Sequence, residues 1–223
     1  DKLLCKFEIE NVSDSDTYCY WWSNIAVELK SSSRFIVPTN KTYLAYYSNG
    51  YHILTYENVP FIDGVDTSYS DKTKVTADYF YDIPSENKKW MYSLDDSGYG
   101  LLQYSSKNTL GKKQFVWGHK QGGEHWNEWV TDGRPYLEVQ SGILETQFQH
   151  FILNKGESVT FYEVYTPYNL TKNSYDASYD SLVINPSGEN IDCFLNCFII
   201  REKFHIQQRS AFINLISHFY ILS

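Results

Sequence analysis

Residues 89–104, KWMYSLDDSGYGLLQY, decide the fold class of this chain. Two short runs of aromatic and aliphatic residues flank the turn sequence DDSG, and this pattern predicts a β-hairpin. Residues 48–50, SNG, give the same signal between two aromatic runs. Residues 3–10 and 158–165 alternate apolar and polar side chains, which is the period of a half-buried strand. We find no helical pattern before residue 190, so strands at this spacing predict an all-β, antiparallel sandwich.

The composition agrees with a β-rich fold. The 223 residues include 20 Tyr, 13 Phe and 6 Trp, and aromatic residues fit pleated sheets. The net charge of -8 argues against a surface for nucleic acid or for an anionic membrane, because both need clustered cations. No apolar run is long enough to span a bilayer. We therefore expect neither nucleic acid nor membrane as a partner.

The cysteines and the start of the chain indicate the compartment. No signal peptide is readable at the first residues, and the chain begins with Asp1, so it reads as a processed or excised piece. The four cysteines, Cys5, Cys19, Cys193 and Cys197, form neither a disulfide framework nor a zinc pattern. Free buried thiols in a reducing compartment are the simplest interpretation, so we expect a cytoplasmic protein that needs no cofactor.

The chain divides into two parts. Residues 1–182 carry the strand and turn pattern, and residues 183–223 form a tail dense in Ile and Phe. Residues 204–222 fit either one amphipathic helix or two strands, and periodicity does not separate these alternatives. The apolar tail is expected to pack on the body or on a partner, which allows a homo-oligomer formed through it.

The most informative segment for function is residues 117–147, WGHKQGGEHWNEWVTDGRPYLEVQSGILETQ. A two-residue turn at Asp132 and Gly133 predicts a hairpin between residues 126–130 and 136–140. Directly opposed residues share a face. One face would then carry His125, Asn127, Trp129, Tyr136, Glu138 and Gln140. Aromatic rings stack on sugar rings, while amides and carboxylates pair with hydroxyls, so this face suits a saccharide; the alternative is an ordinary exposed polar face.

Other candidates are weaker. Trp22 or Trp117 could replace Trp129 as the stacking ring, and Asn24 follows Trp22 on the same strand. His119, Glu124 and His125 match no zinc spacing, so we expect no metal site. Glu145 could pair with Glu138 as a second carboxylate for glycosidic chemistry, although a surface charge is the simpler interpretation.

Several of these motifs resemble a known family. YCYWWSNIAV at residues 18–27, VWGHKQGGEHWNEWVTD at 116–132, YLEVQSG at 136–142 and TFYEVYTP at 160–167 are similar to a bacterial domain family of unknown function that usually precedes tetratricopeptide repeats. The resemblance runs from about residue 4 to about residue 183. It implies a galactose-mutarotase-like supersandwich with a carbohydrate cleft. Family domains have further sheet before Phe7, so the chain is expected to be incomplete at its N-terminus.

The resemblance also implies roles for some residues. Sugar mutarotases use a Glu base in a Glu-x-Gln context, which Glu138 and Gln140 match. The family's acid His has no counterpart near Trp22, which leaves His119 or His125 as the candidate acid. We therefore expect a carbohydrate-binding domain, with Glu138 and His119 as catalytic residues if it is also carbohydrate-active. The alternative is a non-catalytic interaction scaffold.

Overall fold

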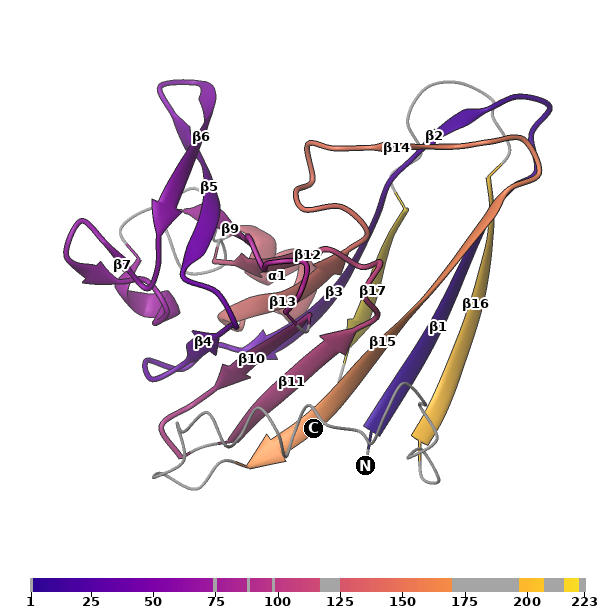
Figure 1. Ribbon diagram of the computed structural model, residues 1–223. Coiled ribbons are helices and arrows are strands. Elements are labelled where there is room, and N and C mark those ends of the chain that lie inside the picture. Colours follow the sequence, from indigo (N-terminus) through magenta and orange to yellow (C-terminus); the bar gives the residue numbers. More distant parts are fainter. Residues whose placement is uncertain are drawn as a thin grey trace.

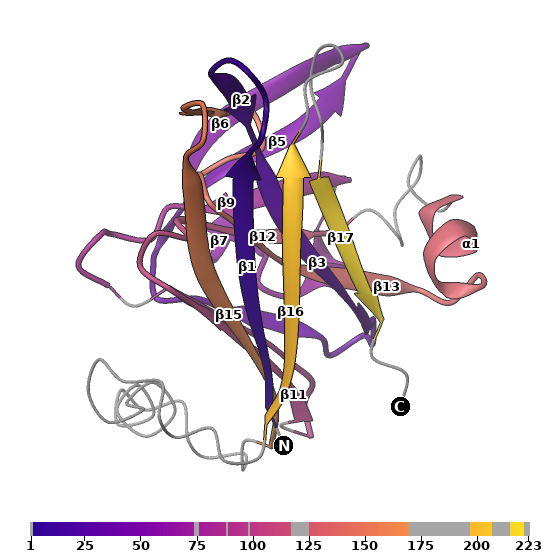
Figure 2. The same ribbon diagram turned by 90° about the vertical axis from the view of Figure 1, so that its right-hand side faces the viewer.

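The computed structural model describes residues 2–73, 76–87, 89–97, 99–116, 125–169, 197–206 and 215–220. These residues form two large β-sheets and two small two-stranded sheets, with one short α-helix and one 3-10 turn (Figures 1 and 2).

The first large sheet has six strands. In spatial order they are β16 (Cys197–Ile206), β1 (Lys2–Asn11), β15 (Ser158–Asn169), β11 (Tyr99–Ser105), β10 (Trp90–Leu94) and β4 (Arg34–Ile36). All of its neighbouring pairs are antiparallel except β16 with β1, which is parallel.

The second large sheet has seven strands. In spatial order they are β17 (Leu215–Tyr220), β3 (Trp21–Glu28), β13 (Tyr136–Gly142), β12 (Gly111–Phe115), β9 (Ala77–Tyr81), β5 (Lys41–Ser48) and β6 (Tyr51–Asn58). The parallel pair here is β17 with β3. The remaining elements are β2 (Thr17–Cys19) with β14 (Phe151–Leu153), β7 (Phe61–Ile62) with β8 (Val65–Asp66), η1 (Ser70–Lys72) and α1 (His125–Thr131).

Aromatic side chains from both sheets meet in the core. Phe7 on β1 lies 4.7 Å from the ring of Trp21 on β3 and 5.2 Å from Phe161 on β15, measured between ring centroids. All three side chains are essentially excluded from solvent. Burying a large apolar side chain contributes about 1.5–3 kcal/mol, so these contacts hold the sheets face to face. The all-β sandwich expected from the sequence is confirmed.

A polar group is also enclosed between the sheets, and we call it the inter-sheet cluster. Lys112 Nζ on β12 donates to Ser105 Oγ on β11 and, at 2.7 Å, to Ser141 Oγ on β13. Glu163 Oε2 on β15 accepts from Tyr165 Oη at 2.6 Å. Burial lowers the pKa of Lys112 to about 7, although the Glu163 carboxylate opposes that shift. Burial likewise raises the pKa of Glu163.

Two of the three hairpins predicted from turn residues are confirmed. β10 pairs with β11 across residues 95–98, and β5 pairs with β6 across Asn49 and Gly50. Asn49 has φ of 51° and Gly50 has φ of 81°, which is the left-handed geometry of a type I′ turn. Asn and Gly are the residues that tolerate this geometry best, which explains why the short signal was sufficient.

The hairpin predicted at Asp132 and Gly133 is wrong. Residues 125–131 form helix α1 in place of a strand, so the expectation of no helix before residue 190 is also wrong. Asp132 has φ of 52° and Gly133 has φ of 84°, and the Gly133 amide donates to Asn127 O at 2.9 Å. This bond reaches back six residues, and two consecutive residues in the left-handed region let it close the C-terminus of the helix. The same Asp-Gly pair therefore satisfies either a hairpin turn or a helix end.

The tail contributes two strands and, in its described part, no helix, although β16 begins ahead of residues 204–222, to which the two alternatives applied. β16 lies beside β1 and β17 lies beside β3, each in parallel register (Figure 2). Of the four cysteines, Cys5 and Cys19 are buried and free of disulfides, and burial raises the pKa of Cys19 to about 11. Cys193 lies outside the described residues. Neither helix in the described part of the chain has the length and apolar character needed to cross a bilayer.

Candidate functional site

The face of the seven-stranded sheet that points away from the six-stranded sheet gathers the polar candidates. Leu137 and Val139 on β13 belong to the core, so the alternate residues Tyr136, Glu138 and Gln140 project from the opposite face, which we call the outer face. The pairing register of β13 with β12 and with β3 determines which residues lie beside them. Those neighbours are Lys113 and Asn24 beside Gln140, and Phe115 and Ala26 beside Glu138.

The Glu138 carboxylate is held at both oxygens. Tyr136 Oη donates to Oε1 at 3.1 Å, and Gln140 Nε2 donates to Oε2 at 2.6 Å. Glu138 is 5% exposed and Gln140 is 1% exposed, so the pair forms the floor of the site. These two hydrogen bonds fix the orientation of the Glu138 carboxylate, whose oxygens are hydrogen-bond acceptors.

Lys113 supplies a cation beside this carboxylate. Its Nζ donates to Gln147 Oε1 at 2.7 Å and lies 3.6 Å from Asp78 Oδ1 on β9. Nζ also lies 5.5 Å from the ring centroid of Phe80 and 5.2 Å from that of Phe115. Burial lowers the pKa of Lys113, while the charges of Asp78 and Glu138 oppose the shift. Burying an ammonium group costs desolvation free energy unless carboxylates and other acceptors pair with it.

Two amide groups complete the donor and acceptor set. Gln147 Nε2 donates to Gln140 Oε1 at 3.4 Å, so the loop after β13 reaches over the floor. Asn24 Oδ1 is buried and has no hydrogen-bond partner among the residues that the structure describes. A buried polar atom without a partner needs a ligand or a water molecule. We call Asn24, Lys113, Glu138, Gln140 and Gln147 the outer-face cluster.

Trp22 packs beneath the cluster. A Cβ atom added at Gly142 would lie 2.2 Å from the Trp22 ring, and one added at Gly111 would lie 2.5 Å from it. Two strands therefore need glycine so that the indole can lie flat against them. Trp22 is fully buried and meets Phe80 edge-on at 5.6 Å between centroids. It acts as packing beneath the site, and no open face of its ring is available for stacking.

The structure separates the other predicted residues from Glu138. His125, Asn127 and Trp129 lie on α1, because the strand that was to carry them is this helix. Trp129 is 69% exposed and contacts His125 at 4.9 Å between ring centroids. The helix meets the site through Trp126, whose ring lies 6.2 Å from that of Phe115. Trp117 and His119 lie outside the described residues.

Sequence reasoning missed Lys113, Asp78, Phe115 and Gln147. The strand period of GKKQF at residues 111–115 shows that Lys112 and Lys113 point to opposite faces, but not which of them meets Glu138. That depends on the register between β12 and β13, which residues distant in sequence set. Glu145 is exposed and influences Tyr43 and Tyr56 electrostatically, so it lies toward β5 and β6.

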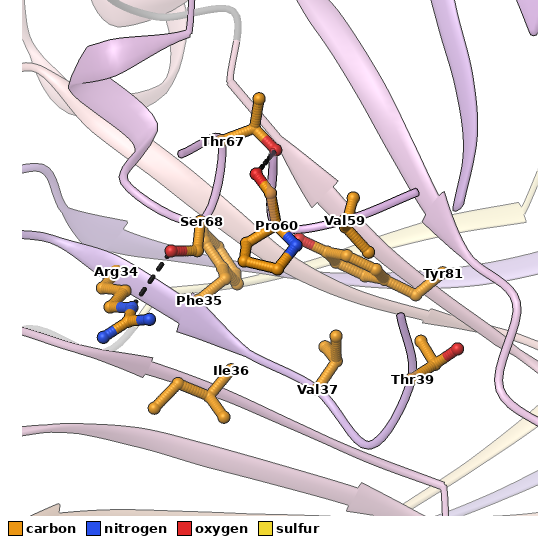
Figure 3. A pocket seen from close by; sticks show the side chains of 10 residues that line it. All are labelled: Arg34, Phe35, Ile36, Val37, Thr39, Val59, Pro60, Thr67, Ser68 and Tyr81. Carbon is orange, nitrogen blue, oxygen red and sulfur yellow. Dashed lines mark hydrogen bonds between the residues drawn. The ribbon is translucent and has the colours of Figure 1, made fainter. Parts of the chain in front are cut away.

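No three His, Cys, Asp or Glu side chains converge as metal ligands within the described ranges. A pocket of about 210 Å³ lies elsewhere, between β4 and residues 59–68 (Figure 3). Its lining is mostly apolar, and Arg34 at one end donates from Nε to Ser68 Oγ at 3.0 Å. None of the predicted site residues is among the residues that line it. The pocket and the outer-face cluster are therefore separate features.

Comparisons with known proteins place the chain. Residues 10–176 match the family of domains of unknown function DUF5107. The chain is similar to a TPR-domain containing protein from Parabacteroides distasonis, with 20% identity and a TM-score of 0.59 over 75% of this chain and 28% of that one. It is also similar to a galactose mutarotase-like protein from Clostridium acetobutylicum, with 9% identity and a TM-score of 0.46 over 72% of this chain and 51% of that one. The chain thus spans less than a third of the first of these structures. The resemblance read from the motifs is confirmed, and the chain belongs to the DUF5107 family.

Proposed function

We propose that the outer-face cluster binds a neutral saccharide. The observation that carries this proposal is the Glu138–Gln140 pair, oriented at 2.6 Å beside Asn24 Oδ1, for which the described side chains offer no hydrogen-bond partner. Sugar hydroxyls both donate and accept, so they match a site that offers a carboxylate, amides and an ammonium within one small area.

The local charge supports a neutral ligand. Glu138 and Asp78 contribute two negative charges, and Lys113 contributes one positive charge that Asp78 already neutralises at 3.6 Å. A phosphorylated sugar would meet the remaining negative charge at Glu138, which disfavours it. Neutral hydroxyls would instead form charge-assisted hydrogen bonds with Glu138 and Lys113.

A ligand must open the site by moving one side chain. Gln147 holds both Lys113 Nζ and Gln140 Oε1, and it is half-buried on the loop that follows β13. A hydroxyl that displaced Gln147 would satisfy the same two groups. Side-chain rearrangements of this kind are common when ligands bind. A reaction with Glu138 as base and His119 as acid is the extension that the family resemblance implies.

Calorimetric titration with glucose, galactose and mannose tests the proposal. We expect one of these sugars to bind, and Glu138→Gln to weaken its binding about tenfold or more, because a hydrogen bond to a charged group contributes about 1.5–3 kcal/mol. The matched control is Glu86→Gln, which removes an exposed carboxylate in the turn after β9. The proposal is overturned if no sugar binds or if both variants bind equally; an absence of binding would favour the interaction scaffold.

A further inference from the structure

The outer face continues beyond the cluster onto the hairpin of β5 and β6. Tyr43 on β5 lies opposite Phe80, and Phe80 lies opposite Lys113, so all three side chains share one face. Tyr56 and His52 on β6 are opposite Tyr43 and Tyr47 and therefore project from the same face. The hairpin extends past the neighbouring strand β9 (Figure 1).

The rings on this hairpin are accessible. Tyr47 is 56% exposed and Tyr56 is 50% exposed. Tyr43 and Tyr56 meet at 4.8 Å between centroids, and Tyr47 meets His52 at 3.8 Å. Exposed large aromatic side chains that gather on one face mark a surface that binds something.

Phe148 joins this surface to the outer-face cluster. Its ring lies 6.0 Å from His52 on β6 and 5.7 Å from Phe80 on β9, between centroids, and it is 50% exposed. Phe80 in turn meets Trp22 beneath the cluster. Ring contacts therefore run from Trp22 through the buried Phe80 to Phe148 and the hairpin, and the rings of Phe148 and the hairpin form the exposed part of this row.

Polar groups accompany the rings along the row. Tyr56 Oη donates to Asp82 Oδ2 at 2.5 Å, and Lys41 Nζ lies 5.4 Å from the Tyr56 ring centroid. The charges of Asp82 and Glu145 both act on Tyr43 and Tyr56, which places these carboxylates beside the rings. Flat rings edged by carboxylates suit a ligand with apolar C–H faces and hydroxyl rims, and suit a purely apolar partner poorly.

We infer that the site takes an oligosaccharide, with one sugar residue at Glu138 and Gln140 and further residues stacked along Phe148, Tyr47 and Tyr56. The inference rests on the proposed function and specifies its substrate class. β13 and β6 are four strand spacings apart, which is about 19 Å at about 4.8 Å per spacing. A single pyranose ring is far shorter than this span, so a monosaccharide at Glu138 leaves the hairpin rings uncovered.

The test compares glucose, galactose and mannose with their 1,4-linked pentasaccharides by calorimetry. We expect a pentasaccharide to bind at least about tenfold more tightly than its monosaccharide. Tyr47→Ala and Tyr56→Ala should weaken pentasaccharide binding about threefold to tenfold each and leave monosaccharide binding unchanged, because each removes one stacking ring. Tyr56→Phe keeps the ring and should retain most of the affinity.

Tyr51→Ala is the matched control, because Tyr51 is 74% exposed on the same hairpin but projects from the opposite face. Equal affinity for monosaccharide and pentasaccharide overturns the inference and leaves the proposed function intact. An equal loss in Tyr51→Ala, or no loss in the Tyr47 and Tyr56 variants, also overturns it. No binding of any sugar overturns the proposed function, and the inference with it.

Discussion

Lys112 and Lys113 are neighbours in sequence, are both buried on β12, and face opposite sides of the same sheet. Lys112 Nζ lies between the two sheets and donates to two serine hydroxyls. Lys113 Nζ lies on the outer face and pairs with Gln147 and Asp78, among aromatic rings. One strand thus places a cation in each of two very different surroundings.

The difference lies in what surrounds each ammonium. The partners of Lys112 are themselves buried between the two sheets, so we expect its cluster to contribute to stability and to the pairing of the sheets. The partners of Lys113 include a half-buried glutamine on a loop, which can move. Identical side chains therefore have a structural role on one face and, in our proposal, a binding role on the other, and substitutions should separate the two.

The largest expected effect is on the inter-sheet cluster. Glu163→Ala should lower the free energy of unfolding by about 3–5 kcal/mol, because it leaves Lys112 buried without its counter-charge. Urea unfolding measures this loss. The double variant Lys112→Met/Glu163→Leu should recover a large part of it, since a packed apolar pair carries no desolvation penalty. If Glu163→Ala lowered the free energy of unfolding by less than about 1 kcal/mol, the Glu163 carboxylate would not be stabilising the Lys112 ammonium.

The pH dependence of stability is the next effect in size. Burial lowers the pKa of Lys112 to about 7 in the folded chain, from 10.5 in the unfolded one. Between these values the unfolded chain binds more protons, so the free energy of unfolding should rise with pH above about 7, by at most about 1.4 kcal/mol per pH unit. Lys112→Met should flatten this rise, which urea unfolding at about pH 7 to 9 measures. An unchanged slope in Lys112→Met would contradict a lowered pKa of Lys112 in the folded chain.

Lys113→Met should have a smaller effect on stability and a clear effect on binding. We expect a loss of about 1–2 kcal/mol in unfolding free energy, because Asp78 is partly exposed and Glu138 keeps two hydrogen bonds. Affinity for the saccharide identified by calorimetry should fall about tenfold. If Lys113→Met destabilised the fold as strongly as Glu163→Ala and left sugar affinity intact, the outer-face cluster would be structural too.

The smallest effect concerns helix α1 at the margin of the outer face. Gly133→Ala should destabilise the chain by about 1 kcal/mol, because Gly133 has φ of 84° while a Cβ atom there meets nothing within 4 Å. Thermal unfolding measures the change. Gly133→Asn should cost less, since Asn tolerates this backbone conformation. A gain in stability with Ala would show that Gly133 is not in the left-handed conformation.

Local signals in the sequence predicted part of this molecule. Asn49 and Gly50 specify their turn by backbone preference alone, and the alternation of Phe7 and Ile9 specifies which face of β1 is buried. Asp132 and Gly133 fit two structures equally well, so the helix could be recognised only from tertiary packing. Glu138 and Gln140 were identified from the strand period, and their shared face is confirmed.

The other members of the outer-face cluster depend on long-range pairing. Lys113 meets Gln140 through the register of β12 with β13, and Gln147 returns to them through the loop after β13. No local sequence pattern predicts these side-chain contacts, because they form only when strands that are distant in sequence pair.

The pairing of β16 with β1 and of β17 with β3 has a consequence for solubility. A strand at the border of a sheet presents free amide and carbonyl groups, and such a row recruits strands from other molecules. The two closing strands protect one border of each sheet. A chain that ended before residue 197 would lack both β16 and β17, and the edges of β1 and β3 would be exposed together. We expect such a shortened protein to self-associate even if its proposed saccharide site stayed unchanged.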